Sequence, residues 1–167
     1  MVTPSFPTTL SNVSTIPTAD YRFIVGEQMR IVKETVRIST QGNADIIDIT
    51  DAVNKHVAQA DIANGLATLF IAGATGGITT IEYEPGLVKD LQQALERLAP
   101  QDAEYFHNIT HADCNGHSHV RASIIGPSLS IPLANHTLQL GQWQQIIFVD
   151  LDNRPRQREI LLQILGE

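Results

Sequence analysis

The chain has 167 residues, of which 43% are hydrophobic and 17% are charged, and it contains one cysteine. That length suits one domain with a substantial core, and a single cysteine excludes a fold held by intramolecular disulfides. The formal net charge of -7 argues against a general nucleic-acid or anionic-membrane surface, because both need a basic face. No apolar run approaches the roughly 20 residues that span a bilayer, and no signal peptide is evident. We therefore expect a cytoplasmic protein.

The first residues are poor in the features that order a chain. Residues 1–20 are rich in Ser, Thr and Pro and contain no Lys or Arg. The small amount of apolar surface cannot offset the entropy lost on ordering, and residues 1–24 are therefore expected to form a flexible tail. The alternative is an arm that lies on a neighbouring subunit. A single domain is expected over residues 25–167.

Alternating apolar and polar residues predict a half-buried strand over Met29–Ser39. A turn at residues 41–43 and a short strand over Asp45–Ile49 follow, and we expect the two strands to form a hairpin. Apolar residues at helical spacing then predict a helix over residues 50–64, which Gly65 ends.

The run Leu66–Ala72 is apolar at nearly every position and predicts a central strand buried on both faces. Residues 73–77, GATGG, link it to a strand over Ile78–Tyr83. Their glycines fit neither the P-loop nor the dinucleotide spacing, so a tight link between strands competes with a phosphate-binding loop. Leucines at helical spacing predict a second helix between Pro85 and Pro100.

Residues 101–116 are expected to be mostly loop, and only strands are predicted after them. Those strands cover residues 118–125, 128–132, 137–140, 144–151 and 157–165. The chain thus has eight or nine strands and two helices, with no βαβ alternation. The predicted fold class is α+β: a mostly antiparallel β-sandwich or curled sheet with two helices, in a single domain.

Four of the six histidines lie close together, at positions 107, 111, 117 and 119. On a strand, His117 and His119 share a face, where two neutral imidazoles can reach one divalent metal at about 2.0–2.1 Å. Zinc is the expected metal, and magnesium is an alternative. The third ligand is expected to be His107, with His111, Asp113 and Glu82 as further candidates. The competing interpretation is a set of hydrogen-bonded histidines at a subunit interface.

Three other residues are candidates for chemistry. Glu82 ends a strand that follows the glycine loop and suits a general base or a metal partner, although an exposed strand-end acid is equally consistent. Arg121 shares the polar face of the histidine strand, so it could bind an anion such as phosphate or form a salt bridge. Cys114 lies among histidines, but no protease signature surrounds it, and we expect it to be incidental.

The sequence contains the string NGHSHVRASIIGPSLSIP, followed by LQLGQWQQIIFVDLD and a terminal R-x-R-x-apolar strand. In these features the chain resembles the YjbQ-like family, also called secondary thiamine-phosphate synthases. The likeness covers about residues 25–166. It implies a compact α+β fold and a homotrimer with sites near subunit boundaries. It also implies a metal or anion pocket formed by His117 and His119, with His107 and Glu82 at two further family positions.

The resemblance extends to an activity. Weak thiamine-phosphate synthase activity is attributed to the family, joining a pyrimidine diphosphate to a thiazole phosphate with release of pyrophosphate. We expect ligand contacts from Asn115, Ser128 and Gln144, and Trp143 matches a further family position. The residues expected to carry the reaction are Glu82, His107, Asp113 and Arg121. Arg121 or a metal would stabilise the departing pyrophosphate.

Two positions depart from the family pattern. Many members carry a histidine where this chain has Gly73, and an asparagine where it has Ile81. We therefore expect a variant branch that binds metal through His107, His117 and His119 or binds it poorly. Two alternatives to a transferase stay open: a metal- or anion-binding trimer without dedicated catalysis, and a structural trimer whose histidines satisfy one another.

Overall fold

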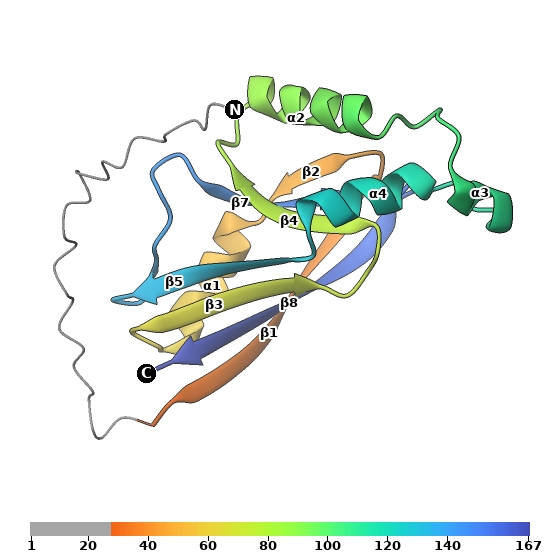
Figure 1. Cartoon of the computed structure of the whole chain (residues 1–167). Helices are drawn as coiled ribbons and strands as arrows, with labels where there is room; N and C mark the ends of the chain where they lie inside the picture. Colours follow the sequence, from red (N-terminus) through yellow and green to blue (C-terminus); the bar gives the residue numbers. More distant parts are fainter. Residues whose placement is uncertain (1–27) are drawn as a thin grey trace, which may run out of the picture.

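A computed structural model describes residues 28–167, in which every strand pairing is antiparallel and the strands form two sheets (Figure 1). The tail expected over residues 1–24 lies outside the described residues. The elements in chain order are β1 (Arg30–Thr40), β2 (Asp45–Asp48), α1 (Thr50–Ala60), β3 (Gly65–Ile71), β4 (Gly76–Ile81), α2 (Pro85–Leu98), α3 (Phe106–Thr110), α4 (Gly116–Ile125), β5 (Ser128–Ala134), β6 (Thr137–Leu138), β7 (Gln145–Asp150) and β8 (Arg156–Gly166).

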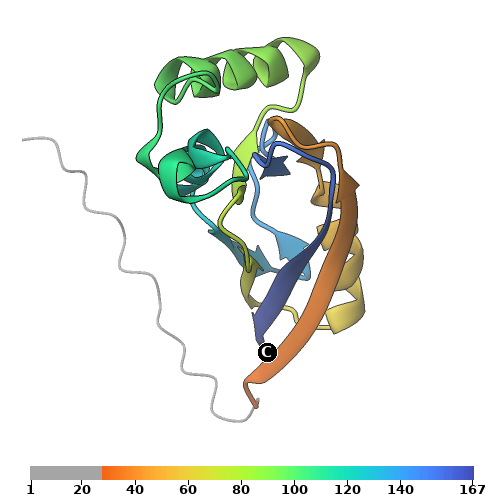
Figure 2. The same cartoon turned by 90° about the vertical axis from the view of Figure 1, so that its right-hand side faces the viewer.

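The larger sheet has the strand order β1-β8-β3-β5-β6, and the smaller has the order β2-β7-β4. A hydrophobic core between the two sheets is closed by the buried stripe of α1, which includes Val53 and Val57. The other face of the smaller sheet packs against α2 and α4 through a second cluster that contains Leu95 and Ala122. In Figure 2, α1 lies on the opposite side of the molecule from α2 and α4. The mostly antiparallel α+β fold with a curled sheet is confirmed.

The expected hairpin between the first two strands was wrong. β1 pairs along its whole length with β8, whereas β2 pairs with β7 in the other sheet. Three successive residues with positive φ, Gly42, Asn43 and Ala44, carry the chain from one sheet to the other. A Cβ at Gly42 would lie 2.6 Å from the Arg154 carbonyl oxygen, so only glycine fits this crossing.

The strand that is buried on both faces is β7 and not β3. Ile146 and Phe148 of β7 face the core between the sheets, whereas Ile147 and Val149 face α2 and α4. In β3, Leu66 and Phe70 are 38% and 42% exposed, because they lie on the outer face of the larger sheet. The prediction that Leu66–Ala72 is buried on both sides was therefore wrong.

The two predicted helices are present with slightly different ends. α1 ends four residues before the predicted end, at Ala60, because Asp61 adopts a left-handed conformation with φ of 51°. In α2, Pro85 occupies the first turn, and the Glu84 carboxylate accepts a hydrogen bond of 2.7 Å from the Gly86 amide. No helix within residues 28–167 is both long and apolar enough to cross a membrane.

The predicted strand over 118–125 is a helix, α4, and a short helix, α3, lies in the predicted loop. Ser118, Arg121, Ala122 and Ile125 are buried or half-buried at spacings of three and four residues, which is the helical period. Gly126, with φ of 92°, ends the helix. The described chain thus has four helices and not two.

Candidate functional site

Three histidines gather at the end of the molecule formed by α3 and the start of α4. The His107 ring stacks on the His111 ring with centroids 4.3 Å apart and planes at 5°. The His107 ring also lies 4.6 Å from that of His119, at 55°. An acid completes the group, because Asp113 Oδ1 lies 3.7 Å from His107 Nε2. These four residues are referred to below as the histidine cluster.

His117 lies outside the histidine cluster. Residues two apart on a helix point about 200° from one another, so His117 turns inward where His119 faces the cluster. The His117 residue is only 1% exposed, its ring centroid lies 6.3 Å from that of Tyr105, and its Nε2 lies 3.3 Å from Ser118 Oγ. The expectation that His117 and His119 share one face was wrong, because it assumed a strand.

The surroundings of His117 favour its neutral form. Burial lowers the pKa of His117 below its ordinary value, and the nearby Arg121 guanidinium acts in the same direction. The acids Glu96, Asp152 and Asp102 oppose this shift without reversing it. His117 Nδ1 is buried and has no hydrogen-bond partner among the described residues.

The predicted ligands His107, His117 and His119 do not converge on one point. Within residues 28–167, no group of three His, Cys, Asp or Glu side chains is arranged to hold a metal ion. The histidine cluster nevertheless contains one feature that fits a metal: His107 Nε2 is buried and lacks a hydrogen-bond partner among the described residues. Its distance to Asp113 Oδ1 is too long for a hydrogen bond.

Arg121 holds two helices together. Its Nε donates to the Ala99 carbonyl oxygen at 2.9 Å, and its Nη2 pairs with Glu96 Oε2 at 2.5 Å. The backbone amide of Gln101, and then Arg121, hold the pKa of Glu96 below its ordinary value. The structure therefore has the salt bridge that was the alternative to an anion site at Arg121. The Arg121 side chain is also only 4% exposed.

Of the predicted ligand-binding residues, Asn115 lies at the start of α4, the helix that carries His119, and Ser128 follows α4 at the start of β5. Asn115 precedes the first residue of α4, makes no side-chain capping bond, is 4% exposed, and has no hydrogen-bond partner for its Oδ1 among the described residues. Ser128 begins β5 and is exposed. It follows Pro127, which lines a hollow together with His119.

Glu82 and Gln144 lie together at the other end of β4. Gln144 Nε2 donates to Thr80 Oγ1 at 3.3 Å, and Glu82 is exposed just beyond the strand. Gly76, at the start of β4, lines the hollow that contains His119. Six residues of extended chain separate Gly76 from Glu82, which corresponds to roughly 20 Å. Within one chain, the structure therefore does not bring Glu82 to the histidine cluster.

The glycine loop GATGG is the link between β3 and β4. A Cβ at Gly76 would lie 2.8 Å from Phe148, and one at Gly77 would lie 2.6 Å from Ile125, so both glycines are needed for close packing. The loop also borders a hollow of about 220 Å³, referred to below as the loop hollow. It is lined by Gly73, Ala74, Gly76, His119, Ala122, Ser123 and Pro127.

Sequence reasoning missed a buried polar network at the turn between β7 and β8. Arg158 binds both carboxylate oxygens of Asp150 at 2.7 Å, and Arg156 Nε binds Asp152 at 2.8 Å. Although burial raises the pKa of Asp152, hydrogen bonds from Arg156 and Thr75 hold it below its ordinary value. The signal was the pair of motifs D-L-D and R-x-R, whose period of two places each pair on one strand face.

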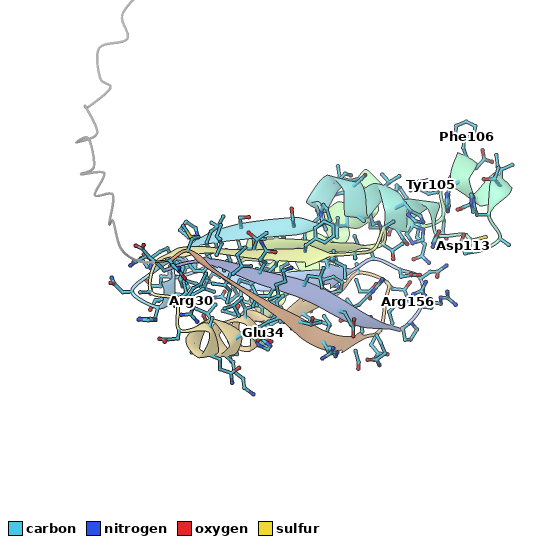
Figure 3. All side chains as sticks on the ribbon, turned by 90° about the horizontal axis from the view of Figure 1, so that it is seen from below. Arg30, Glu34, Tyr105, Phe106, Asp113 and Arg156 are labelled. Carbon is cyan, nitrogen blue, oxygen red and sulfur yellow. The ribbon has the colours of Figure 1, made fainter. Side chains whose placement is uncertain are left out.

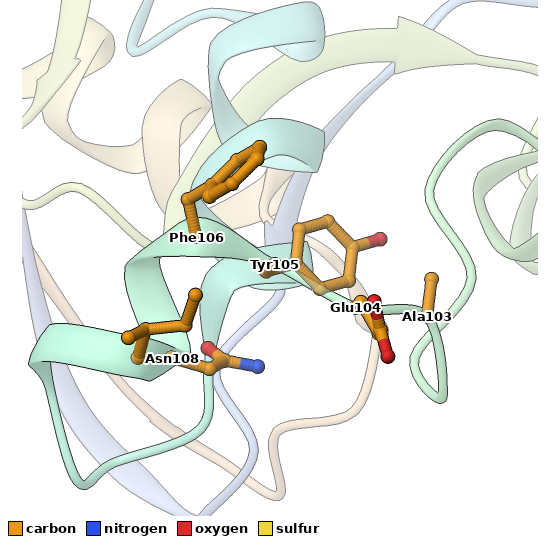
Figure 4. A pocket seen from close by; sticks show the side chains of 6 residues that line it. Ala103, Glu104, Tyr105, Phe106 and Asn108 are labelled. Atoms are coloured by element: carbon orange, nitrogen blue, oxygen red, sulfur yellow. The ribbon is translucent and has the colours of Figure 1, made fainter.

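This network lies at the same end of the molecule as the histidine cluster, as the positions of Arg156 and Asp113 in Figure 3 show. A hydrogen bond connects the two, because Asn153 Nδ2 donates to the Asp113 carbonyl oxygen at 2.7 Å. A separate hollow of about 510 Å³ lies against α3 (Figure 4). Its lining residues are Ala103, Glu104, Tyr105, Phe106, Asn108 and Ile109, which include no histidine.

Comparison with known proteins places the chain in a family. Residues 34–167 match the family described as UPF0047 protein YjbQ-like. A UPF0047 protein of Methanothermobacter thermautotrophicus is 34% identical over 142 residues, which cover 85% of this chain and 97% of that protein. The UPF0047 protein YugU of Bacillus subtilis is 30% identical over 134 residues, covering 80% and 98%.

Solved structures agree with this assignment. A YbjQ-like protein of unknown function from Sulfolobus solfataricus has a TM-score of 0.80 and 31% identity, covering 84% of this chain and all of the other. A hypothetical protein from Aeropyrum pernix has a TM-score of 0.77 and 30% identity, covering 81% and 99%. The chain therefore belongs to the YjbQ-like UPF0047 family.

Proposed function

We propose that the histidine cluster binds a divalent metal ion, with zinc preferred over magnesium. The observation that carries the proposal is the buried, unpartnered Nε2 of His107, which lies 3.7 Å from Asp113 Oδ1. Two ligand atoms on a tetrahedral zinc ion are separated by roughly 3.3 Å when its bonds are about 2.0–2.1 Å long. The observed separation is close to that value, so a modest movement of the Asp113 side chain would bring both atoms onto one ion.

The donor set supports zinc. His107 and His119 would supply imidazole nitrogen and Asp113 a carboxylate oxygen, which are borderline and hard donors that zinc accepts. Asp113 thus replaces His117 in the ligand set expected from the sequence. A zinc ion bound by three protein groups keeps one position for a small ligand and acts there as a Lewis acid.

We further propose that the ligand is small and phosphorylated and occupies the loop hollow beside His119. The hollow of about 220 Å³ is below the usual range of about 300–1,000 Å³ for drug-sized ligands, so it suits only part of such a molecule. We place binding ahead of thiamine-phosphate synthase catalysis for two reasons. Arg121 is already paired with Glu96, and Glu82 lies at the far end of β4.

Self-association into a homotrimer is also proposed, because the larger sheet has an apolar outer face. Ile31 pairs with Leu165, which pairs in turn with Leu66, and all three side chains are at least 36% exposed. Phe70 and Leu161 form a second exposed pair on this face, at 42% and 48%. Contiguous apolar surface of this kind marks subunit interfaces, and three copies arranged around a three-fold axis could bury this face against one another.

The metal proposal is tested by elemental analysis and native mass spectrometry of the purified protein after dialysis against zinc. We expect about one zinc ion per chain, and its loss in His107→Ala with the fold retained. His136→Asn is the matched control, because His136 is exposed, lies in the β5–β6 turn and has a positive φ that asparagine tolerates. Wild-type protein that takes up no zinc contradicts the proposal.

A further inference from the structure

Gly73 is a glycine that the fold does not require. Its φ lies outside the left-handed region, and a Cβ built on it would meet only Arg158 Nη1 at 3.6 Å and Ile71 Cγ1 at 3.9 Å. Both distances are ordinary van der Waals contacts, so a Cβ at position 73 would be tolerated without a clash. This contrasts with Gly76 and Gly77 in the same loop, where a Cβ would clash. Because Gly73 has no side chain, the position of its Cβ, 3.6 Å from Arg158 Nη1, is left unfilled.

Arg158 presents one free nitrogen toward that position. Its Nε and Nη2 bind the two oxygens of Asp150 at 2.7 Å, and Nη2 also donates to Thr75 Oγ1 at 3.0 Å. These bonds fix the plane of the guanidinium group, because Asp150 is fully buried. Nη1 donates to no protein acceptor within residues 28–167 and is the nitrogen nearest to Gly73.

Two hollows are lined by residues at or next to this position. Gly73 lines the loop hollow, as His119 does. The preceding residue, Ala72, lines a hollow of about 380 Å³ together with Ile71, Gln157, Arg158, Glu159 and Leu161. A ligand that enters the loop hollow therefore lies next to both His119 and Gly73, and the Cβ position of Gly73 is 3.6 Å from the free Arg158 nitrogen.

We propose that the space over Gly73 is an anion subsite, in which Arg158 Nη1 binds the phosphate group of the ligand. The ligand class rests on the function proposed above, but the subsite rests on Gly73 and Arg158 alone. Arginine held in place by a carboxylate is well suited to phosphate, since its remaining N–H groups are pre-oriented for charge-assisted hydrogen bonds. The subsite takes over the role that the sequence assigned to Arg121.

The surrounding charges allow an anion here. The buried acids Asp150 and Asp152 are each paired with an arginine, Arg158 and Arg156 respectively. Glu159 lines the neighbouring hollow, but Arg37 binds its carboxylate at 2.9 Å. Each of these three acids thus has an arginine partner. A phosphate at Nη1 would meet the N–H edge of Arg158 while the opposite edge stays bound to Asp150.

The test introduces a carboxylate side chain at position 73 that would occupy the subsite in place of phosphate. Gly73→Glu puts a carboxylate beside Arg158 Nη1, Gly73→Gln is its neutral isostere, and Gly73→Ala is the control that adds only the tolerated Cβ. Binding of inorganic phosphate is measured by calorimetry on the full-length protein at constant ionic strength. We expect Gly73→Ala to bind phosphate within about twofold of wild type and Gly73→Glu to bind at least about tenfold more weakly, with Gly73→Gln between them.

Two results would overturn the subsite. One is a wild-type protein that binds no phosphate at millimolar concentrations, and the other is a Gly73→Glu variant that binds phosphate as tightly as wild type. Zinc uptake, measured on the same variants, separates this proposal from the metal site. If zinc uptake fails but the Gly73 series behaves as expected, the subsite stands and the metal proposal falls. If zinc binds normally and Gly73→Glu has no effect on phosphate binding, the metal proposal stands and the anion subsite falls.

Discussion

Asn153 Nδ2 donates a hydrogen bond of 2.7 Å to the carbonyl oxygen of Asp113, and this bond joins the β7–β8 turn to the loop of the histidine cluster. Within residues 28–167, no other side-chain hydrogen bond joins Asp113 to that turn, and the Asp113 side chain is 53% exposed. The position of its carboxylate beside His107 therefore depends on Asn153, which holds the Asp113 backbone and is not itself a proposed metal ligand. Asn153 is a positioning residue for the cluster.

Asn153→Ala should weaken zinc binding by about tenfold, because residues that orient metal ligands typically contribute 10–100-fold in affinity. The free energy of unfolding of the metal-free protein should fall by only about 1 kcal/mol, the usual contribution of one hydrogen bond. Zinc affinity is measured by competition with a chelating dye, and stability by urea denaturation. A variant with unchanged zinc affinity would show that Asp113 is not a ligand or needs no support.

Arg121→Met should destabilise the protein by about 1–3 kcal/mol, mainly because it leaves the buried Ala99 carbonyl oxygen without its donor and also removes the ion pair with the half-exposed Glu96. Arg37→Met is the matched control. Arg37 also pairs with a glutamate, Glu159, but both side chains are mostly exposed, so its loss should cost at most about 1 kcal/mol. Urea denaturation midpoints compare the two, and equal losses would contradict a structural role for Arg121.

How far the sequence predicts the fold depends on whether the information is local. β1 and α2 were predicted closely, because the period of their apolar residues is read within a few turns or pleats. The partner of β1 was not, because β8 begins at Arg156, more than a hundred residues further along the chain. Two strands separated by a short turn favoured a hairpin, and the positive φ angles that prevent it have no clear signature beyond Gly42 and Asn43.

The site was predicted in its residue types more than in its geometry. The sequence around His117 and His119 alternates like a strand, yet the same residues carry a helical period that begins at Ser118. Both patterns are present in a stretch this short, and packing against β4 decides between them. The role of Arg158 could not be assigned, because the orientation of its free nitrogen depends on Asp150 across the sheet turn.

Stability should fall in mild acid because of His117. Its folded pKa is lowered, so the unfolded chain binds a proton first as the pH drops below about 6.5, the value for an unperturbed histidine. The contribution of His117 to stability is therefore complete above about pH 6.5 and is lost as the pH falls toward the folded pKa. His117→Gln should flatten this dependence, as measured by urea denaturation between pH 7 and pH 5. An unchanged slope would place the acid sensitivity elsewhere.

The loop glycines should respond differently to the same substitution. Gly77→Ala places a Cβ 2.6 Å from Ile125 and should destabilise the protein by about 1–3 kcal/mol through overpacking against α4. Gly73→Ala meets nothing closer than 3.6 Å and should be neutral, or stabilising by about 0.4–1 kcal/mol through the unfolded state. Thermal unfolding distinguishes them. A destabilised Gly73→Ala would mean that the fold itself needs this glycine.

The outer face of the larger sheet should control assembly. Leu165→Lys places a charge between Ile31 and Leu66 on the apolar face, so self-association should cost the burial of an unpaired ammonium group. We expect a trimeric mass for the wild type in light scattering, and a monomeric mass for Leu165→Lys with an unchanged circular dichroism spectrum. Ile124→Lys is the matched control, since Ile124 is 54% exposed but belongs to α4. A trimer that survives Leu165→Lys would assign the interface to another surface. If both variants dissociate equally, the added charge itself would be the cause, because an interface on the larger sheet would be disrupted by Leu165→Lys and not by Ile124→Lys.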